Sequence, residues 1–134
     1  MDTEVLELST GRNRVVVDIT PEVARFVAGK DDGIVQVFCP HATAGVALIE
    51  TGAGSEADLL GIIDHVLPPG FGYRHQHGSP GHGADHVLPA FVAPSLTIPV
   101  IGGRMQLGTW QSVVLVDPNR DNPNRRVRLS FLNG

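Results

Sequence analysis

Short apolar runs separated by turn residues fill most of this chain and constrain its fold more than any other feature. The run Arg126–Phe131 alternates, with Val127, Leu129 and Phe131 on one side, as expected for a half-buried strand. Further runs have the apolar or β-branched character of strands: Val5–Leu8, Val15–Ile19, Ile34–Phe38, Ala44–Ile49, Leu96–Ile101, Met105–Thr109 and Ser112–Val116. The chain is therefore expected to consist mainly of strands.

Two segments carry the signals of helix termini. Thr20–Glu22 combines a capping hydroxyl, a proline at the first position and an acid in the first turn, and Gly29 ends this helix. Ser55 and Asp58 resemble a capping box, after which apolar residues keep helical spacing as far as Val66. These helices among many strands predict an α+β fold on an antiparallel or mixed sheet, as a single domain over residues 1–134.

The composition argues against several classes of protein. The formal net charge of -4 is not that of a nucleic-acid-binding protein. Met1–Thr10 lacks the basic and apolar regions of a signal peptide, and no apolar run approaches the length of a membrane span. Cys39 is the only cysteine, so no disulfide can form within the chain. We therefore expect a cytoplasmic protein that binds no membrane.

Five of the six histidines fall within His65–His86, and most of them lie in the Gly/Pro-rich loop Pro68–Gly83. Loops of this length are usually functional or disordered. A short helix can start at Gly83, and His82 and His86 are four residues apart, the spacing that places two imidazoles on one helical face. The loop therefore indicates a site.

A metal site needs about three or four converging ligands, and histidine is the commonest ligand. His75 and His77 are two residues apart and face one way in extended chain. The histidines that could supply ligands are His41, His75, His77, His82 and His86. His65, in the last turn of a helix, is expected to complement the helix dipole instead.

Other candidate residues each leave two interpretations open. Glu50 ends an apolar strand, where a charge is unusual unless it is paired or functional. Asp58 is either a helix cap or a site residue. Cys39 and His41 could form a nucleophile and its base, although a lone cysteine at a strand end is more often a small buried apolar residue.

The last third of the chain offers two further candidate surfaces. Gln106 and Trp110 could bind a planar heterocycle, or Trp110 could belong to the core with the amide at the surface. Arg120, Arg125 and Arg126 could form an anion clamp, or they could be the solvated edge of the final strand.

Several motifs, in the same order along the chain, resemble those of one family. The segments that carry the resemblance are Pro40–Val46 with Ile49–Glu50, Tyr73–His75, Ala84–His86, Ser95–Val100 and Gly103–Gln111. Leu107–Gln111 is the most specific of them. The family is the YjbQ-type proteins, identified as secondary thiamine-phosphate synthases, and the match runs over essentially the whole chain.

This resemblance implies an α+β fold, a homotrimer and a histidine-rich pocket that holds a divalent metal, with zinc favoured. It also implies an activity that joins a pyrimidine pyrophosphate to a thiazole phosphate and releases pyrophosphate. The implied metal ligands are His41, His75 and His86, with His77 and His82 as extra candidates. The implied catalytic and substrate-binding residues are Glu50, Asp58, His41, Thr43, Gln106, Trp110 and Arg126.

The chain also departs from the family pattern. The family usually has Thr at Ala42, Asn at His82 and often Asp near His77, and Pro89 is atypical. Two imidazoles thus replace an amide and a carboxylate. Two other functions stay open: a metal-dependent hydrolase or lyase of an unknown phosphorylated or carbonyl metabolite, and a non-catalytic protein that binds a metal or a metabolite.

Overall fold

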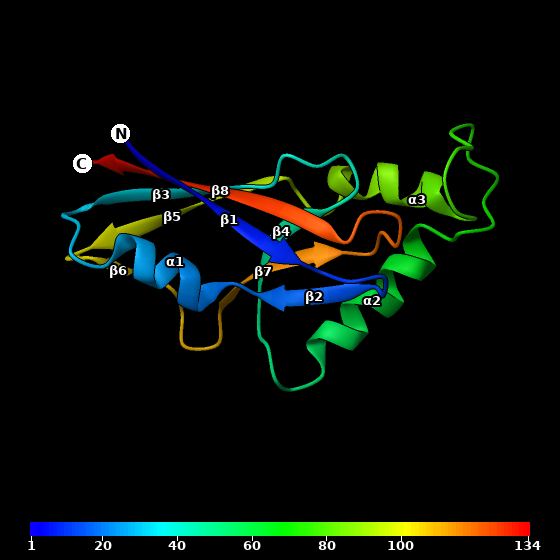
Figure 1. Cartoon of the computed structure of the whole chain (residues 1–134). Coiled ribbons are helices and arrows are strands. Elements are labelled where there is room, and N and C mark those ends of the chain that lie inside the picture. Colours follow the sequence, from blue (N-terminus) through cyan, green and yellow to red (C-terminus); the bar gives the residue numbers. More distant parts are fainter.

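The computed structural model describes residues 1–134 and consists of two antiparallel sheets, three α-helices and one 3₁₀ turn (Figure 1). In chain order the elements are β1 (Asp2–Ser9), β2 (Val15–Asp18), α1 (Thr20–Val27), β3 (Gly33–Phe38), β4 (Gly45–Ile49), α2 (Ser55–Val66), α3 (His82–Val87), η1 (Leu88–Ala90), β5 (Ser95–Ile101), β6 (Arg104–Met105), β7 (Ser112–Asp117) and β8 (Asn124–Asn133). No helix is both long enough and apolar enough to cross a bilayer.

The larger sheet has the strand order β1-β8-β3-β5-β6, and the smaller has the order β2-β7-β4. The final strand β8 lies inside the larger sheet between β1 and β3, where Val127 pairs with Leu6 of β1 and Leu129 pairs with Val37 of β3. Val127, Leu129 and Phe131 are buried, as their alternation predicts. The α+β fold with antiparallel sheets is confirmed.

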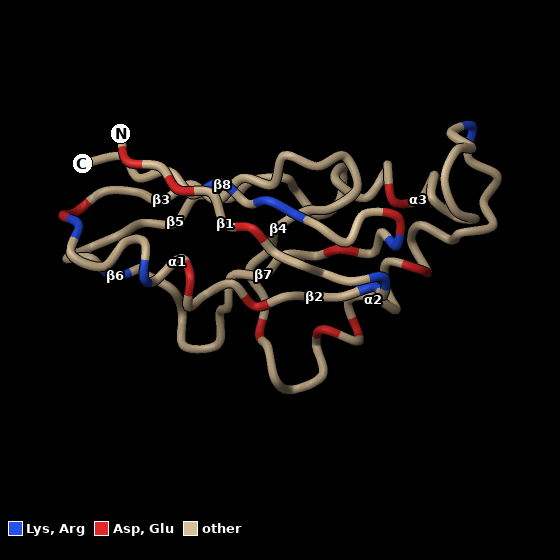
Figure 2. Tube along the Cα trace, viewed as in Figure 1, with Lys and Arg blue, Asp and Glu red and all other residues tan.

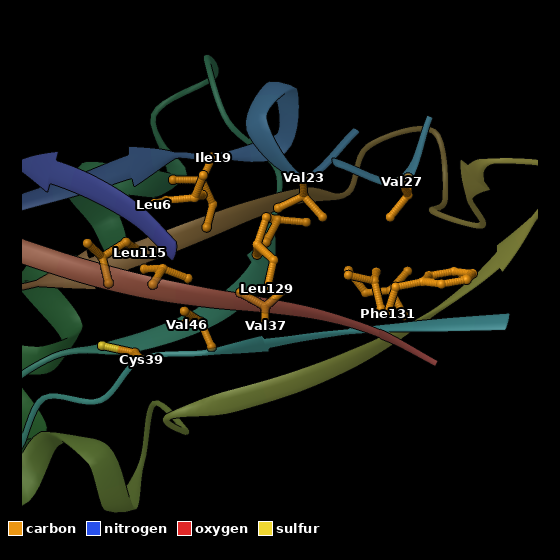
Figure 3. Packing of buried hydrophobic residues seen from close by; sticks show 14 of the residues in the cluster. Leu6, Ile19, Val23, Val27, Val37, Cys39, Val46, Leu115, Leu129 and Phe131 are labelled. Atoms are coloured by element: carbon orange, nitrogen blue, oxygen red, sulfur yellow. The ribbon is translucent and has the colours of Figure 1, made fainter. Parts of the chain in front are cut away.

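The main core lies between α1 and the two sheets (Figure 3). Val23 and Val27 of α1 are fully buried against Leu129 and Phe131 of β8, and Cys39 lies at the edge of the same cluster. Burying an aliphatic side chain of this size stabilises a fold by about 1.5–3 kcal/mol. This core holds the two sheets together through side-chain packing.

A smaller core attaches the helices α2 and α3 to the other face of the small sheet. Val113 and Leu115 of β7 point into the main core, whereas Val114 and Val116 belong to the second cluster with Ile63 and three other buried residues. β7 is therefore buried on both faces, which explains why its sequence is a continuous apolar run and not an alternating one. This second core positions the helical end of the molecule.

One expected strand is much shorter than predicted. Within Met105–Thr109, only Met105 belongs to the two-residue strand β6. The backbone N–H of Gln106 still donates to Pro99. The chain then turns at Gly108, whose N–H donates to the side chain of Gln111, and this turn ends the strand.

Both helices begin where predicted, but without the predicted caps. Thr20 is the first helical residue of α1, and its hydroxyl accepts a hydrogen bond from the Val113 N–H instead of capping the helix. The N-cap of α2 is Gly54, at a φ of 102° that favours glycine. No side chain caps either helix, so the capping box at Ser55 and Asp58 is wrong.

Candidate metal centre

Four histidines form a compact cluster at the end of the molecule that carries α3. One nitrogen each of His75, His77, His82 and His86 lies within 4.8 Å of the others. The closest pair is His82 Nε2 and His86 Nε2, 2.8 Å apart. The ring centroids of His75 lie 3.9 Å from His77 and 4.0 Å from His86. We refer to these four residues as the histidine quartet.

Local backbone geometry brings the quartet together. Helix α3 places His82 and His86 on one face, because residues four apart are neighbours on a helix. The loop before α3 folds back so closely that a Cβ at Gly83 would lie 2.5 Å from Tyr73 Cβ and 2.7 Å from the carbonyl oxygen of His75. Only glycine at position 83 allows this approach, which brings His75 and the residues after it against the helix.

His82 is the buried member of the quartet, with 7% of its side chain exposed. Its Nε2 faces His86, while its Nδ1 lies 3.0 Å from Asp121 Oδ2 and 4.0 Å from Asp85 Oδ2. The Asp121 contact has the distance of an ion pair but is not aligned as a hydrogen bond. The same Asp121 oxygen accepts from the Ser79 N–H. A carboxylate behind an imidazole is the usual way to orient a metal-ligating histidine.

The surroundings of His75 and His86 favour the uncharged imidazole. Burial, followed by the charge of the neighbouring imidazoles, lowers the pKa of both His75 and His86. Burial also raises the pKa of Asp85 to about 6, against the opposing effect of His82. Neutral imidazole is the form that binds metals.

The donor set of the quartet fits a divalent transition metal. Imidazole nitrogens suit zinc, copper and nickel, and a zinc site takes three or four such ligands. His82 Nδ1 is buried without a hydrogen-bond partner. The charged groups within 4.0 Å of this nitrogen are the carboxylates of Asp85 and Asp121. His75 and His77 are exposed and border an open cavity, which leaves one side of the cluster accessible to solvent or substrate.

His41 does not join the quartet in the single chain, contrary to the predicted ligand set. Its Nε2 accepts a hydrogen bond of 2.9 Å from the Arg126 backbone N–H. In the neutral ring the proton is therefore on Nδ1, so neither nitrogen has a free lone pair for a metal. Burial, followed by the charge of Arg125, lowers the pKa of His41.

Thr43, which was predicted to bind substrate, is part of a buried polar network in the single chain. Its hydroxyl oxygen accepts from Asn119 Nδ2 at 2.7 Å and from an Arg125 nitrogen at 2.9 Å. Arg125 also binds both carboxylate oxygens of Asp117 at 2.8 Å. Nε and Nη2 of Arg125 are therefore engaged inside the fold, and those atoms are not available to an anion.

The remaining predicted site residues lie away from the quartet. Glu50 and Asp58 are exposed and border neither of the two cavities beside α3. Gln106 and Trp110 lie on the exposed segment between β6 and β7, with 73% of Trp110 exposed, so Trp110 is not a core residue. The Arg126 side chain is exposed and lies 3.7 Å from Glu7. In the single chain, these residues do not form one site with the histidines.

The possible nucleophile Cys39 is buried, as expected for a small apolar residue. Burial raises the pKa of its thiol to about 11. The thiolate form that a nucleophile requires is therefore disfavoured.

Two carboxylates beside the quartet were not recognised as site residues in the sequence. Asp85 is adjacent to a recognised histidine, but its spacing alone does not separate it from a surface acid. Asp121 comes from the polar turn between β7 and β8, and no local pattern connects that turn to the histidine loop. The tertiary fold brings it there through the Ser79 hydrogen bond.

The structure is that of a small α+β protein with two antiparallel sheets, and in this chain a cluster of imidazoles lies beside a short helix. The family model described as "UPF0047 protein YjbQ-like" matches residues 4–134. The chain belongs to this YjbQ-like UPF0047 family.

Relatives and solved structures agree with this assignment. A UPF0047 protein of Mycobacterium tuberculosis is 62% identical over 134 residues, covering 100% of both chains. One of Archaeoglobus fulgidus is 32% identical, covering 90% of this chain and 93% of its own. A crystal structure of a YbjQ-like protein of unknown function from Sulfolobus solfataricus superposes with a TM-score of 0.91 at 27% identity, covering 99% of this chain and 97% of the other.

Proposed function

We propose that this protein is a metal-dependent enzyme that acts on a phosphorylated small molecule, with thiamine-phosphate synthase-type transfer as its reaction. The observation that carries the metal-dependent part is the histidine quartet, with its four nitrogens within 4.8 Å. The family resemblance described above suggests the reaction.

In the proposed reaction, the ring nitrogen of a thiazole phosphate attacks the methylene carbon of a pyrimidine pyrophosphate. A carbon–nitrogen bond forms, the carbon–oxygen bond breaks, and its electron pair leaves with pyrophosphate. A divalent metal bound by the quartet would neutralise charge on the leaving group.

The chain's own residues have separate tasks in this proposal. His75, His77 and His86 supply ring nitrogens, and Asp121 orients His82 so that its Nε2 faces the cluster. The exposed edge at His75 and His77 leaves space for the substrate.

The test combines metal analysis with product formation. The purified protein, treated with a chelator and then reloaded with zinc, is supplied with both precursors, and thiamine phosphate is measured. We expect about one zinc per chain and product formed only by the loaded protein. The His75→Ala/His77→Ala variant should lose both, whereas His65→Ala, an exposed histidine on α2, should retain both. Product without metal, or no product from the zinc-loaded protein, would overturn the proposal.

The open side of the quartet also supports a second candidate, a metal-dependent hydrolase or lyase. Exposed His75 and His77 allow water to reach the cluster, and metal-bound water is a nucleophile near neutral pH. A panel of phosphate esters and lactones, tested with and without chelator, separates this activity from the transfer reaction. Metal binding without turnover on any of them would favour a non-catalytic binding protein.

We also propose that the protein forms a homotrimer and lies in the cytoplasm. The outer face of the larger sheet exposes Val5, Ile34, Phe38 and Leu132, and covering such residues with a second copy would bury apolar area. Light scattering coupled to size exclusion should give a mass of three chains, and cell fractionation should place the protein with the cytoplasm. A single-chain mass would contradict the trimer.

A further inference from the structure

A second cavity lies on the other side of α3 from the histidine quartet. Its volume is about 350 Å³, and it is bordered by α2, by α3 and by the segment that follows β7. Cavities of this size accommodate small metabolites. Figure 2 shows that acidic and basic segments both occur at this end of the molecule.

Two opposite charges in this cavity lack hydrogen-bond partners. Asp85 has 17% of its side chain exposed and makes no hydrogen bond. Its one contact within ion-pair distance is His82 Nδ1 at 4.0 Å, and the charge of Arg14 also acts on its carboxylate. Arg120 also borders the cavity, is exposed, and makes no ion pair or side-chain hydrogen bond. A half-buried carboxylate without a hydrogen bond is costly, so a donor brought by a ligand would stabilise it.

The other arginine in the cavity is already satisfied. Arg14 contacts Asp64 Oδ2 at 2.6 Å and the Leu60 carbonyl oxygen at 3.1 Å. Arg14 therefore acts as part of the wall, and the free charges for a ligand are those of Asp85 and Arg120.

An apolar surface lines the cavity beside these charges. Ile63 and Leu67 come from α2 and the residue that follows it, and Leu88 follows α3. All three belong to the second core, so this wall is held by packing and does not depend on a ligand. This apolar wall can contact a short alkyl chain of a ligand.

We propose that this cavity binds a small zwitterionic molecule, with its cationic nitrogen against Asp85, its anionic group against Arg120 and its apolar body on Ile63 and Leu88. This inference does not rest on the proposed function, because none of these residues belongs to the histidine quartet. It assigns a second ligand site to the same end of the molecule.

The probes are ω-amino acids of increasing length, from 4-aminobutanoate to 6-aminohexanoate, titrated calorimetrically into the full chain at pH 8. Their matched controls are hexanoate, which lacks the ammonium group, and hexylamine, which lacks the carboxylate. We expect saturable binding with an optimum at one chain length, and affinity at least about tenfold lower for either control, because each loses one charge-assisted contact. Equal binding of hexanoate, or no binding by any member of the series, would overturn the proposal.

Two variants locate the site within the fold. Asp85→Asn and Arg120→Gln should each lower affinity for the best probe by about tenfold or more. Asp31→Asn and Arg104→Gln, exposed charges on other elements, should leave it unchanged. Unchanged affinity in Asp85→Asn, together with weaker metal retention, would assign Asp85 to orienting His82 and would overturn the zwitterion site.

A quartet variant separates this proposal from the metal-dependent function. His75→Ala/His77→Ala should lose metal and still bind the zwitterion with unchanged affinity. Loss of zwitterion binding in this variant would contradict the independence of the two sites, and failure of the enzymatic test would leave the titration result unaffected.

Discussion

Two polar clusters in this molecule differ in how their hydrogen bonds are satisfied. In the first, the Arg125 guanidinium and the Asp117 carboxylate are almost completely buried and bind each other twice, and Thr43 and Asn119 complete the network. In the second, the histidine quartet, the imidazole nitrogens face one another. Only one contact within that cluster, at 2.8 Å, has the length of a hydrogen bond.

This difference indicates a different role for each cluster. A buried charge pair whose hydrogen bonds are made within the fold acts mainly on folding. Imidazoles whose nitrogens face one another with few hydrogen bonds between them can offer lone pairs to a cation, and binding a cation between them stabilises such a group. The comparison predicts that damage to the first cluster changes stability and damage to the second changes ligand binding.

The largest expected effect is on stability, from removal of Arg125. Arg125→Ala leaves Asp117, which has no exposed surface, as an unpaired buried charge. We expect a loss of about 3–5 kcal/mol in the free energy of unfolding, measured by urea denaturation. The control Arg128→Ala removes an exposed arginine that binds Thr3 and should cost less than about 0.5 kcal/mol. Similar losses in both variants would contradict a structural role for the Arg125 network.

The next effect concerns the response of stability to zinc. At a zinc concentration of about 100 times the dissociation constant, the free energy of unfolding should rise by about 2.7 kcal/mol. His82→Ala/His86→Ala should abolish the rise, whereas His65→Ala should preserve it. Because each variant is compared with and without zinc, any change in its own stability cancels. A rise that survives in His82→Ala/His86→Ala would place the metal elsewhere.

A smaller effect, on zinc affinity, is expected from removing the negative charge of Asp121 beside the histidine quartet. Asp121→Asn keeps an oxygen that can accept from the Ser79 N–H but removes the negative charge 3.0 Å from His82 Nδ1. We expect zinc affinity to fall by about 10–100-fold, measured by competition with a chromophoric chelator. Asp31→Asn serves as the matched control. Unchanged zinc affinity would show that Asp121 only fixes the loop.

The fold could be predicted where the physical cause is local. The alternation of Arg126–Phe131 shows directly which face of β8 is buried. The prediction of a strand over Met105–Thr109 was wrong for most of that segment. A turn closed by the hydrogen bond from Gly108 N–H to the Gln111 side chain takes the place of the hydrogen bonds between strands. The predicted helix caps were wrong for two different reasons. The Thr20 hydroxyl accepts a hydrogen bond from Val113 of β7 and so does not cap α1. In α2 the N-cap position is Gly54, in the left-handed conformation, and not Ser55.

The candidate site could be predicted only in part for the same reason. The spacing of His82 and His86 is a local helical signal, and the quartet contains both. Asp121 and the separate environment of His41 depend on contacts between distant segments. Sequence motifs and residue spacings do not show which distant segments come into contact in the fold.

The smallest effect tests whether His41 belongs with the Arg125 network. Burial, followed by the charge of Arg125, lowers the pKa of His41 below its ordinary 6.5. The unfolded chain therefore binds this proton more readily, and the stability that the neutral ring contributes is complete above pH 6.5 and is lost as the pH falls toward the lowered value. His41→Gln does not titrate, whereas the other groups with shifted pKa values are present in both proteins and cancel. The free energy of unfolding of the wild type minus that of His41→Gln should therefore decrease between pH 8 and pH 5. A difference that stays constant or grows over this range would mean that burial and the charge of Arg125 do not hold His41 neutral in the fold.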